Sequence, residues 1–163
     1  MKFCRQLWLL GPLLLASGCV GQGDVASSPF SVAGQKDLKL TLRMPWRTVA
    51  IGERIEVVVT AENTSDEPIE LVSRSGASVH LRIWRYTGLA WQQVKRYPEA
   101  TTMVTTVWSI DPGSQRRFVI PITVEPDWPT GEVVAMTAEL DGRPDVVPRL
   151  TFHVFVPAEQ TSR

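Results

Sequence analysis

The sequence predicts an all-β protein, with one antiparallel β-sandwich domain of about eight or nine strands. Apolar and polar residues alternate with period two in one segment after another between about Asp37 and Pro157, which is the pattern of strands buried on one face. Turn-forming residues separate these segments, and none of them carries the i, i+3, i+4, i+7 apolar stripe of an amphipathic helix. Many short strands at this spacing are typical of a two-sheet sandwich.

The expected strands follow in chain order. In the first, Leu38, Leu40 and Leu42 share one face. The later segments are 55–61, 69–74, 79–83, 91–96, 102–110, 118–124, 133–140 and 150–156, with turns expected at 51–53, 63–68, 86–88, 111–114 and 141–142. Pro121 has no amide hydrogen, so we expect the strand around it to be an edge strand or to be interrupted there.

The start of the chain has the features of an export signal. Lys2 and Arg5 precede an apolar run from Leu7 to Leu15, which is too short to span a membrane as a helix. The run ends in Ala16-Ser17-Gly18-Cys19, which resembles the lipobox of bacterial lipoproteins, with alanine where leucine is commoner. The resemblance implies a signal peptide of residues 1–18 and a diacylglycerol on the sulfur of Cys19. The alternative is an ordinary signal-peptidase site, which would leave Cys19 as a free thiol.

The cysteine count favours lipidation. Cys4 leaves with the signal, so Cys19 is the remaining cysteine and cannot form an internal disulfide. A free thiol is unusual in an oxidising compartment, whereas two or three acyl chains anchor a protein stably to a membrane. Val20 stands where lipoproteins retained in the inner membrane often carry aspartate, so the resemblance implies the outer membrane of the bacterial cell envelope, where the cell has one. Residues 19–36 have the composition of a flexible tether, and residues 158–163 are expected to form a tail.

The charge balance excludes some partners. The chain has 17 basic and 17 acidic side chains, and cleavage removes Lys2 and Arg5. A slightly acidic protein does not attract nucleic acid or an anionic membrane surface. We therefore expect no nucleic acid partner, and membrane attachment through the lipid alone.

The turns of the domain resemble those of bacterial immunoglobulin-like modules. The motifs are Ala50-Ile51-Gly52-Glu53, Glu62-Asn63-Thr64-Ser65-Asp66-Glu67-Pro68, Ser75-Gly76 and Asp111-Pro112-Gly113-Ser114, with an aromatic hairpin from Trp84 to Trp91. Over roughly residues 38–140 the chain is most similar to the intracellular proteinase inhibitor domain family first described in Bacillus. The resemblance implies an immunoglobulin-like β-sandwich. It assigns no inhibitory residues, and an export signal departs from the pattern of an intracellular inhibitor.

No motif for catalysis or cofactor binding stands out, so we expect a protein that is not an enzyme and has no cofactor or metal. His80 and His153 each lie opposite the aliphatic face of their strand, which is the ordinary place of a surface histidine. Two histidines do not supply the three or four ligands of a zinc site. Four turn aspartates offer oxygens to calcium without the spacing of a calcium loop, namely Asp111, Asp127, Asp141 and Asp145.

Tryptophans are the candidate binding residues. Trp46 and Trp128 lie in proline-flanked loops, where a rigid amphipathic ring is suited to contact a partner or a sugar. The alternative is that both cap the open ends of the core. Trp84 and Trp91 flank the turn at 86–88 and are expected to stack as a cross-strand pair. Four arginines are expected to lie over such rings, namely Arg43, Arg82, Arg85 and Arg96.

Three functions remain open from the sequence. The first is a lipid-anchored cell-envelope protein with a non-catalytic immunoglobulin-like module that binds another envelope protein or a glycan. The second is an inhibitor of secreted or envelope proteases, for which the proline-containing loops 125–132 and 142–148 are the candidates because rigidity lowers the entropy lost on docking. The third is a spacer or assembly subunit that adds a strand to another sheet.

Overall fold

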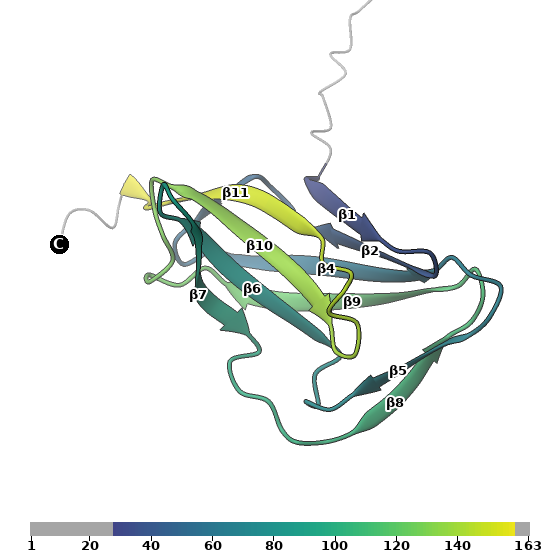
Figure 1. The fold of residues 1–163 in the computed structure, drawn as a ribbon. Helices are drawn as coiled ribbons and strands as arrows, with labels where there is room; N and C mark the ends of the chain where they lie inside the picture. Colours follow the sequence, from purple (N-terminus) through teal and green to yellow (C-terminus); the bar gives the residue numbers. More distant parts are fainter. Residues whose placement is uncertain (1–27, 159–163) are drawn as a thin grey trace, which may run out of the picture.

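The computed structural model describes residues 28–158, which form an all-β sandwich, as predicted (Figure 1). The strands are β1 (Phe30–Gly34), β2 (Leu38–Arg43), β3 (Thr48–Ala50), β4 (Arg54–Asn63), β5 (Ile69–Ser73), β6 (Val79–Tyr86), β7 (Trp91–Tyr97), β8 (Thr106–Ile110), β9 (Gln115–Thr123), β10 (Val133–Leu140) and β11 (Arg149–Phe155). Within the described range, no helix has the length and apolar character needed to cross a bilayer.

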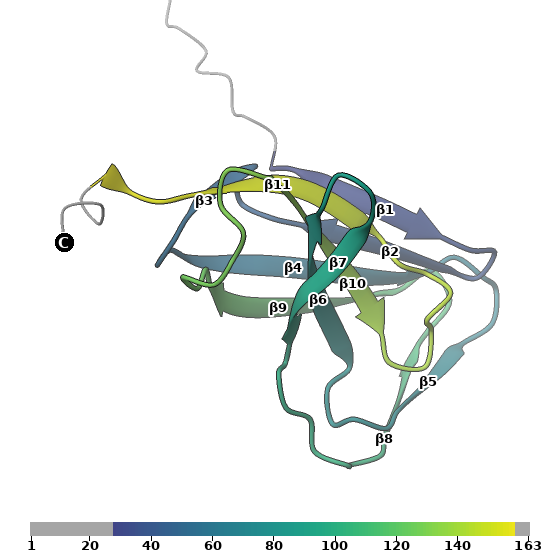
Figure 2. The ribbon, with the colours of Figure 1, turned by 60° about the vertical axis from the view of Figure 1, so that its left-hand side comes forward.

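Two sheets form the layers of the sandwich. One has the strand order β1-β2-β4-β9, and the other has the order β3-β11-β10-β6-β7. Neighbouring strands are antiparallel, except that β3 runs parallel to β11. A two-stranded ribbon of β5 and β8 projects from the lower side of the sandwich in both views (Figures 1 and 2).

The core lies between the two layers and follows the alternation of the sequence. Leu38, Leu40 and Leu42 of β2 are fully buried and belong to one apolar cluster with Met136 and Phe152 of the opposite sheet. Removing such a side chain from water contributes about 1.5–3 kcal/mol. Because the inner positions are fixed by this burial, the intervening residues must lie on the outer faces of the sheets.

Two strands were not predicted, so the expectation of eight or nine strands was too low. Strand β1 lies inside the stretch 19–36 that the sequence analysis assigned to the tether, and it pairs with β2 along its whole length. Its Phe30 and Val32 stay about half exposed and only Ala33 packs against the core, so main-chain pairing rather than burial holds this edge strand. Strand β3 has three residues, too few to show a period. The domain therefore begins before residue 37.

The prediction for Pro121 is confirmed. It lies in β9, the edge strand of its sheet, with Glu56 of β4 as its register partner. The strand expected at 102–110 is shorter than predicted, because β8 begins at Thr106.

The turn at 63–68 is held by Asn63, which is fully buried. Its side-chain amide donates to the carbonyl oxygens of Ile110 and Glu67 at 2.8 and 2.7 Å, and its oxygen accepts from the amide of Ser65 at 2.9 Å. A hydrogen bond of this kind contributes about 0.5–1.5 kcal/mol, and a buried amide left without partners costs more. The Asn-Thr-Ser motif thus fixes the exit of β4 against β8.

Candidate functional site

The two loop tryptophans have opposite environments. Trp46 is 57% exposed, and its Nε1 donates to Glu53 Oε1 at 2.9 Å. Trp128 is 2% exposed, contacts the ring of Phe152 edge-on and donates from Nε1 to the Tyr97 hydroxyl at 3.2 Å. Trp128 is therefore a core residue and is not available as a surface contact, whereas Trp46 is.

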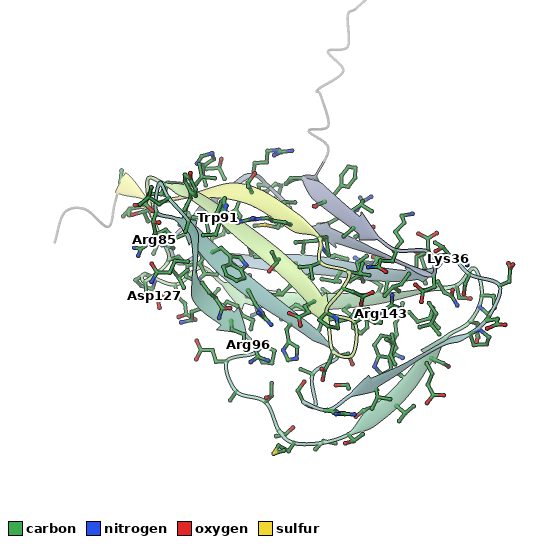
Figure 3. The ribbon with its side chains drawn as sticks, viewed as in Figure 1. Lys36, Arg85, Trp91, Arg96, Asp127 and Arg143 are labelled. Carbon is green, nitrogen blue, oxygen red and sulfur yellow. The ribbon has the colours of Figure 1, made fainter. Side chains whose placement is uncertain are left out.

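The hairpin tryptophans do not stack on each other as predicted. The register places Trp91 opposite Tyr86, with ring centroids 5.2 Å apart. The Arg149 guanidinium lies 3.8 Å from the centroid of the Trp91 ring. Trp91 is labelled in Figure 3. Trp84 is half-buried and donates from Nε1 to Thr137 Oγ1 at 2.9 Å. Both rings thus lie on the outer face of the β3-β11-β10-β6-β7 sheet, each with partners of its own.

The expected arginine–ring contacts are largely made by other arginines. Of the four named from the sequence, Arg43 lies over a ring, that of Phe30, at 5.3 Å. The other three contact polar side chains instead: Arg82 pairs with Glu139, Arg85 bonds to Gln92, and Arg96 lies against His80. Arg116 and Arg149 cover Trp108 and Trp91.

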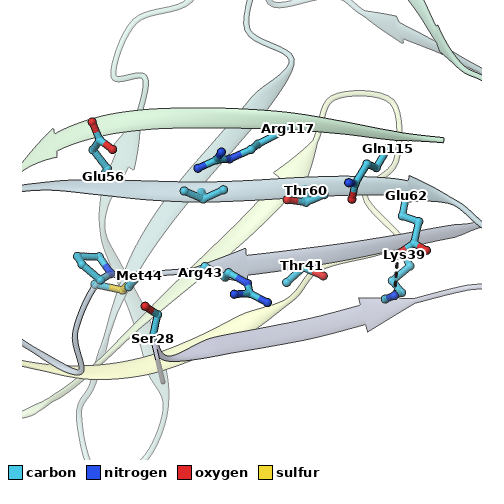
Figure 4. A pocket seen from close by; sticks show the side chains of 12 residues that line it. Ser28, Lys39, Thr41, Arg43, Met44, Glu56, Thr60, Glu62, Gln115 and Arg117 are labelled. Carbon is cyan, nitrogen blue, oxygen red and sulfur yellow. Dashed lines mark hydrogen bonds and ion pairs between the residues drawn. The ribbon is translucent and has the colours of Figure 1, made fainter. Parts of the chain in front are cut away.

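A polar furrow of about 610 Å³ lies on the outer face of the β1-β2-β4-β9 sheet (Figure 4). The strand register sets its side chains in rows. Lys39, Glu62 and Gln115 form one row, Thr41, Thr60 and Arg117 the next, and Arg43, Val58 and Val119 the third. Glu56 and Met44 lie at the end opposite Lys39. Three strands that are distant in sequence therefore build one concave surface.

Two arginines of the furrow have no carboxylate partner. Lys39 Nζ pairs with Glu62 Oε2 at 2.7 Å, which neutralises one end. Arg43 and Arg117 are exposed and form no ion pair with any residue in the range 28–158. Beside Arg43, the ring of Phe30 is 54% exposed. The furrow thus holds two positive charges open to a ligand, and the Phe30 ring lies on β1 beside one of them.

The structure also assembles a cluster that the sequence analysis did not foresee. His80 lies on the outer face of its sheet as expected, yet it is 4% exposed rather than at the surface. Its Nε2 lies 3.0 Å from Ser75 Oγ, and Ser75 Oγ donates to Asp141 Oδ2 at 2.8 Å. Arg96 Nη2 lies 3.2 Å from Nδ1 of the same ring. The residues come from β6, β7 and two loops, so no local sequence motif predicts the cluster.

The hydrogen bonds of this cluster run in the wrong direction for nucleophilic catalysis. An arginine can only donate, so Nδ1 of His80 accepts from Arg96 and the ring proton lies on Nε2, which donates to Ser75. A catalytic histidine must instead accept the serine proton on Nε2 while a carboxylate holds its other nitrogen. Here the carboxylate of Asp141 contacts the serine. Burial and the neighbouring Arg96 lower the pKa of His80, which keeps the ring neutral.

The turn aspartates are separated, and three of them have protein partners. Burial acts to raise the pKa of Asp141, but hydrogen bonds from Ser75, the Arg74 amide and Ser73 outweigh it, and the pKa is lowered. Asp145 pairs with Arg143 and Asp127 with Lys95. The residues between 28 and 158 contain no group of three or more side chains that could hold a metal ion.

The two loops predicted to insert into a protease are packed against the domain and are not free to do so. In loop 125–132, Trp128 is buried; in loop 142–148, Val146 is 1% exposed and Arg143 pairs with Asp37 at 2.8 Å. Loop 98–105, between β7 and β8, is more exposed, and its Met103 is 98% exposed. Its main chain is tied back by a 3.2 Å hydrogen bond from the Gly76 amide to the carbonyl of Val104.

An apolar groove of about 420 Å³ runs beside the β9 edge and is lined by Phe118, Ile120 and Tyr97 among others. Pro121 in this edge supplies no amide hydrogen for an added strand. Strand addition through β9, the third function considered above, would therefore lack a main-chain bond at this position.

Comparisons with known proteins bear on the fold. No family model matches the chain, and no curated protein matches it. The sporulation control protein Spo0M of Bacillus subtilis is similar in structure, with 18% identity and a TM-score of 0.50 over 76% of this chain and 51% of that chain. The alkylpurine DNA glycosylase AlkC of Pseudomonas fluorescens (15% identity, TM-score 0.47, 72% of this chain and 30% of that chain) and a cycloisomaltooligosaccharide glucanotransferase of Paenibacillus sp. (12%, 0.45, 69% and 13%) are more distant. This chain thus spans about half or less of the structures that it resembles, and the likeness concerns the β-sandwich alone.

Proposed function

We propose that this protein is a lipid-anchored protein of the bacterial cell envelope, and that its β-sandwich is a non-catalytic module that binds an envelope partner through the furrow. The observation that carries the proposal is the pair of exposed, unpaired arginines, Arg43 and Arg117, on a concave sheet face. In the same furrow, Thr41 and Thr60 present hydroxyl groups that have no hydrogen-bond partner within residues 28–158. Polar groups without protein partners on a hollow surface are suited to a ligand.

The direction of the hydrogen bonds around His80 supports the proposal that the module is non-catalytic. His80 donates to Ser75 and is held neutral by burial, so it does not activate the serine. A binding role requires no such group.

The anchor is tested at Cys19, which lies outside the described residues. We expect the Cys19→Ala variant to lose the label when cells are fed radioactive palmitate, and to leave the membrane fraction. Cys4→Ala is the matched control, because that residue leaves with the signal and its loss should change neither result. An unlabelled wild-type chain would overturn the lipid anchor.

The binding surface is tested by filling the furrow. Thr60 lies at its centre, on β4, and Thr151 is an exposed threonine on β11 of the other sheet. After cross-linking in whole envelopes, we expect the wild type and Thr151→Trp to capture the same partner and Thr60→Trp to lose it. Capture that survives Thr60→Trp would place the binding surface elsewhere, and no capture by any form would count against a binding module.

Protease inhibition is the second candidate, and the exposed loop 98–105 is the observation in its favour. The side chain of Met103 is exposed, and the Gly76 amide donates a hydrogen bond to the Val104 carbonyl of the same loop. We expect an inhibitor to slow a subtilisin-like or chymotrypsin-like protease at stoichiometric concentration, with loss of the effect in Met103→Asp. Leu89→Asp is the matched control, since Leu89 is 96% exposed at another turn. A large excess that leaves a panel of such proteases unaffected would remove this candidate.

A further inference from the structure

We propose that the ligand of the furrow is an acidic oligosaccharide, whose carboxylate groups bind Arg43 and Arg117. This inference rests on the proposed binding function and goes further by naming the chemical class of the partner. It follows from three properties of the furrow: where its charges lie, what lies between them, and how little the rest of the protein attracts anions.

The two arginines are separated, which favours a ligand with more than one acidic group. Arg43 lies on β2 and Arg117 on β9, with β4 between them, and their register partners on β4 are Val58 and Thr60. Two strand spacings of about 4.8 Å and one step of about 7 Å along the strand separate their positions. Figure 4 shows the two guanidinium groups on opposite sides of β4. A single small anion does not reach both, whereas a chain with repeated carboxylates does.

The surface around the arginines suits a sugar. The row of Thr41 and Thr60 offers hydroxyl groups, and the next row offers apolar surface from Val58, while the half-exposed ring of Phe30 lies on β1, beyond Arg43. Sugar rings present hydroxyl groups at their edges and C–H groups on their faces, so they match alternating polar and apolar rows. The carboxylate of Glu56 at the far end has no ion-pair partner in the described chain and can accept from ligand hydroxyls. A nonpolar peptide would leave these groups unpaired.

General electrostatic attraction does not explain the site. The full chain has equal numbers of basic and acidic residues. Lys39 is neutralised by Glu62. Glu56, without an ion-pair partner in the described range, adds a negative charge at the far end of the furrow. Attraction for an acidic chain therefore depends on Arg43 and Arg117, and it should weaken with salt because both groups are exposed.

The test measures binding of the mature chain, solubilised in detergent, to oligogalacturonate by titration calorimetry. The matched ligand is the same oligomer with its carboxylates reduced to alcohols. We expect the acidic oligomer to bind, the reduced one to bind at least tenfold more weakly, and Arg43→Gln and Arg117→Gln each to lower affinity about tenfold. Arg74→Gln removes an exposed arginine from the β5–β6 connection and should leave affinity unchanged. Unaltered thermal unfolding of the variants shows that they fold.

The outcomes separate this inference from the proposed function. If the acidic and reduced oligomers bind equally, or if the arginine variants bind like wild type, the acidic ligand is overturned while a binding module stands. If vesicles containing phosphatidylglycerol bind through the two arginines and the oligosaccharide does not, the ligand is a lipid headgroup and the inference is wrong. If no ligand binds and Thr60→Trp changes no capture in envelopes, both proposals fail.

Discussion

His80 Nε2 lies 3.0 Å from the hydroxyl oxygen of Ser75, within a chain of hydrogen bonds that runs from Arg96 through the imidazole and the serine to Asp141. Each member donates to the next, so the chain holds together only while His80 is neutral. A second proton on the ring would place an N–H against the Arg96 guanidinium. The cluster therefore links the protonation of one buried histidine to the packing of two loops.

We predict that stability falls as the pH is lowered through 6.5, the ordinary pKa of histidine, and that His80 is the cause. The folded pKa of His80 is lowered below 6.5, by burial first and then by Arg96, with Asp141, Glu139 and Arg82 also nearby. Below pH 6.5 the unfolded chain binds a proton that the folded chain resists, so stability is lost as the pH falls towards the folded pKa. Thermal unfolding at several pH values measures this.

The control for this prediction is the other histidine. His80→Gln should flatten the pH dependence, whereas His153→Gln, at an exposed position on β11, should retain it. A His80→Gln variant with the slope of the wild type would contradict the assignment.

We predict that Asp141→Asn destabilises the fold by about 1–3 kcal/mol, because hydrogen bonds to a charged group are stronger than neutral ones. Four donors converge on Asp141 Oδ2, from Ser73, Ser75 and the amides of residues 74 and 75. Urea denaturation measures the change, and Asp111→Asn in an exposed turn should be close to neutral.

The effect of Asp141→Asn should also depend on pH. The pKa of Asp141 is lowered from 3.8 in the folded state, so its contribution is present above that value and is lost as the pH falls through the folded pKa. The difference in stability between wild type and Asp141→Asn should therefore shrink in strong acid. A constant difference would show that the charge is not what stabilises the loops.

Substitution of two tryptophans should separate core from surface. Trp128→Ala is expected to cost about 3–5 kcal/mol, because it leaves a cavity among buried rings. Trp46→Ala should change stability by less than about 1 kcal/mol, because the ring is mostly exposed and loses one hydrogen bond. Equal losses in denaturant titrations would contradict the two environments.

Gly76→Ala should loosen the loop that carries Met103. The φ angle of Gly76 is +68°, and an added Cβ would lie 2.5 Å from Thr102 Oγ1. We expect a loss of stability above the roughly 1–2 kcal/mol of the backbone angle alone, and faster proteolytic cleavage near Met103. Gly88→Ala is the matched control, since Gly88 also has a positive φ but no atom within 4 Å of its added Cβ. Equal effects of the two substitutions would show that Thr102 does not brace the loop.

The alternation of the sequence was sufficient to predict nine of the strands, because period-two burial is a local property. It failed for β1, where Phe30 and Val32 point to solvent and pairing with β2 holds the strand. It also failed for the stacking of Trp84 and Trp91, because the register of a hairpin depends on its turn, and the turn here pairs Trp91 with Tyr86.

The sequence by itself determined that this is an all-β sandwich and which residues of the predicted strands face its core, because apolar and polar side chains alternate along a strand that is buried on one face. It also predicts an export and lipidation signal at Cys19, which lies outside the described residues and stays a prediction. Only the tertiary structure decided that Trp128 is buried while Trp46 is exposed, and that His80, Ser75 and Asp141 meet. The furrow belongs to the second group, because Arg43 and Arg117 come to lie on one sheet face only through the register of β2, β4 and β9.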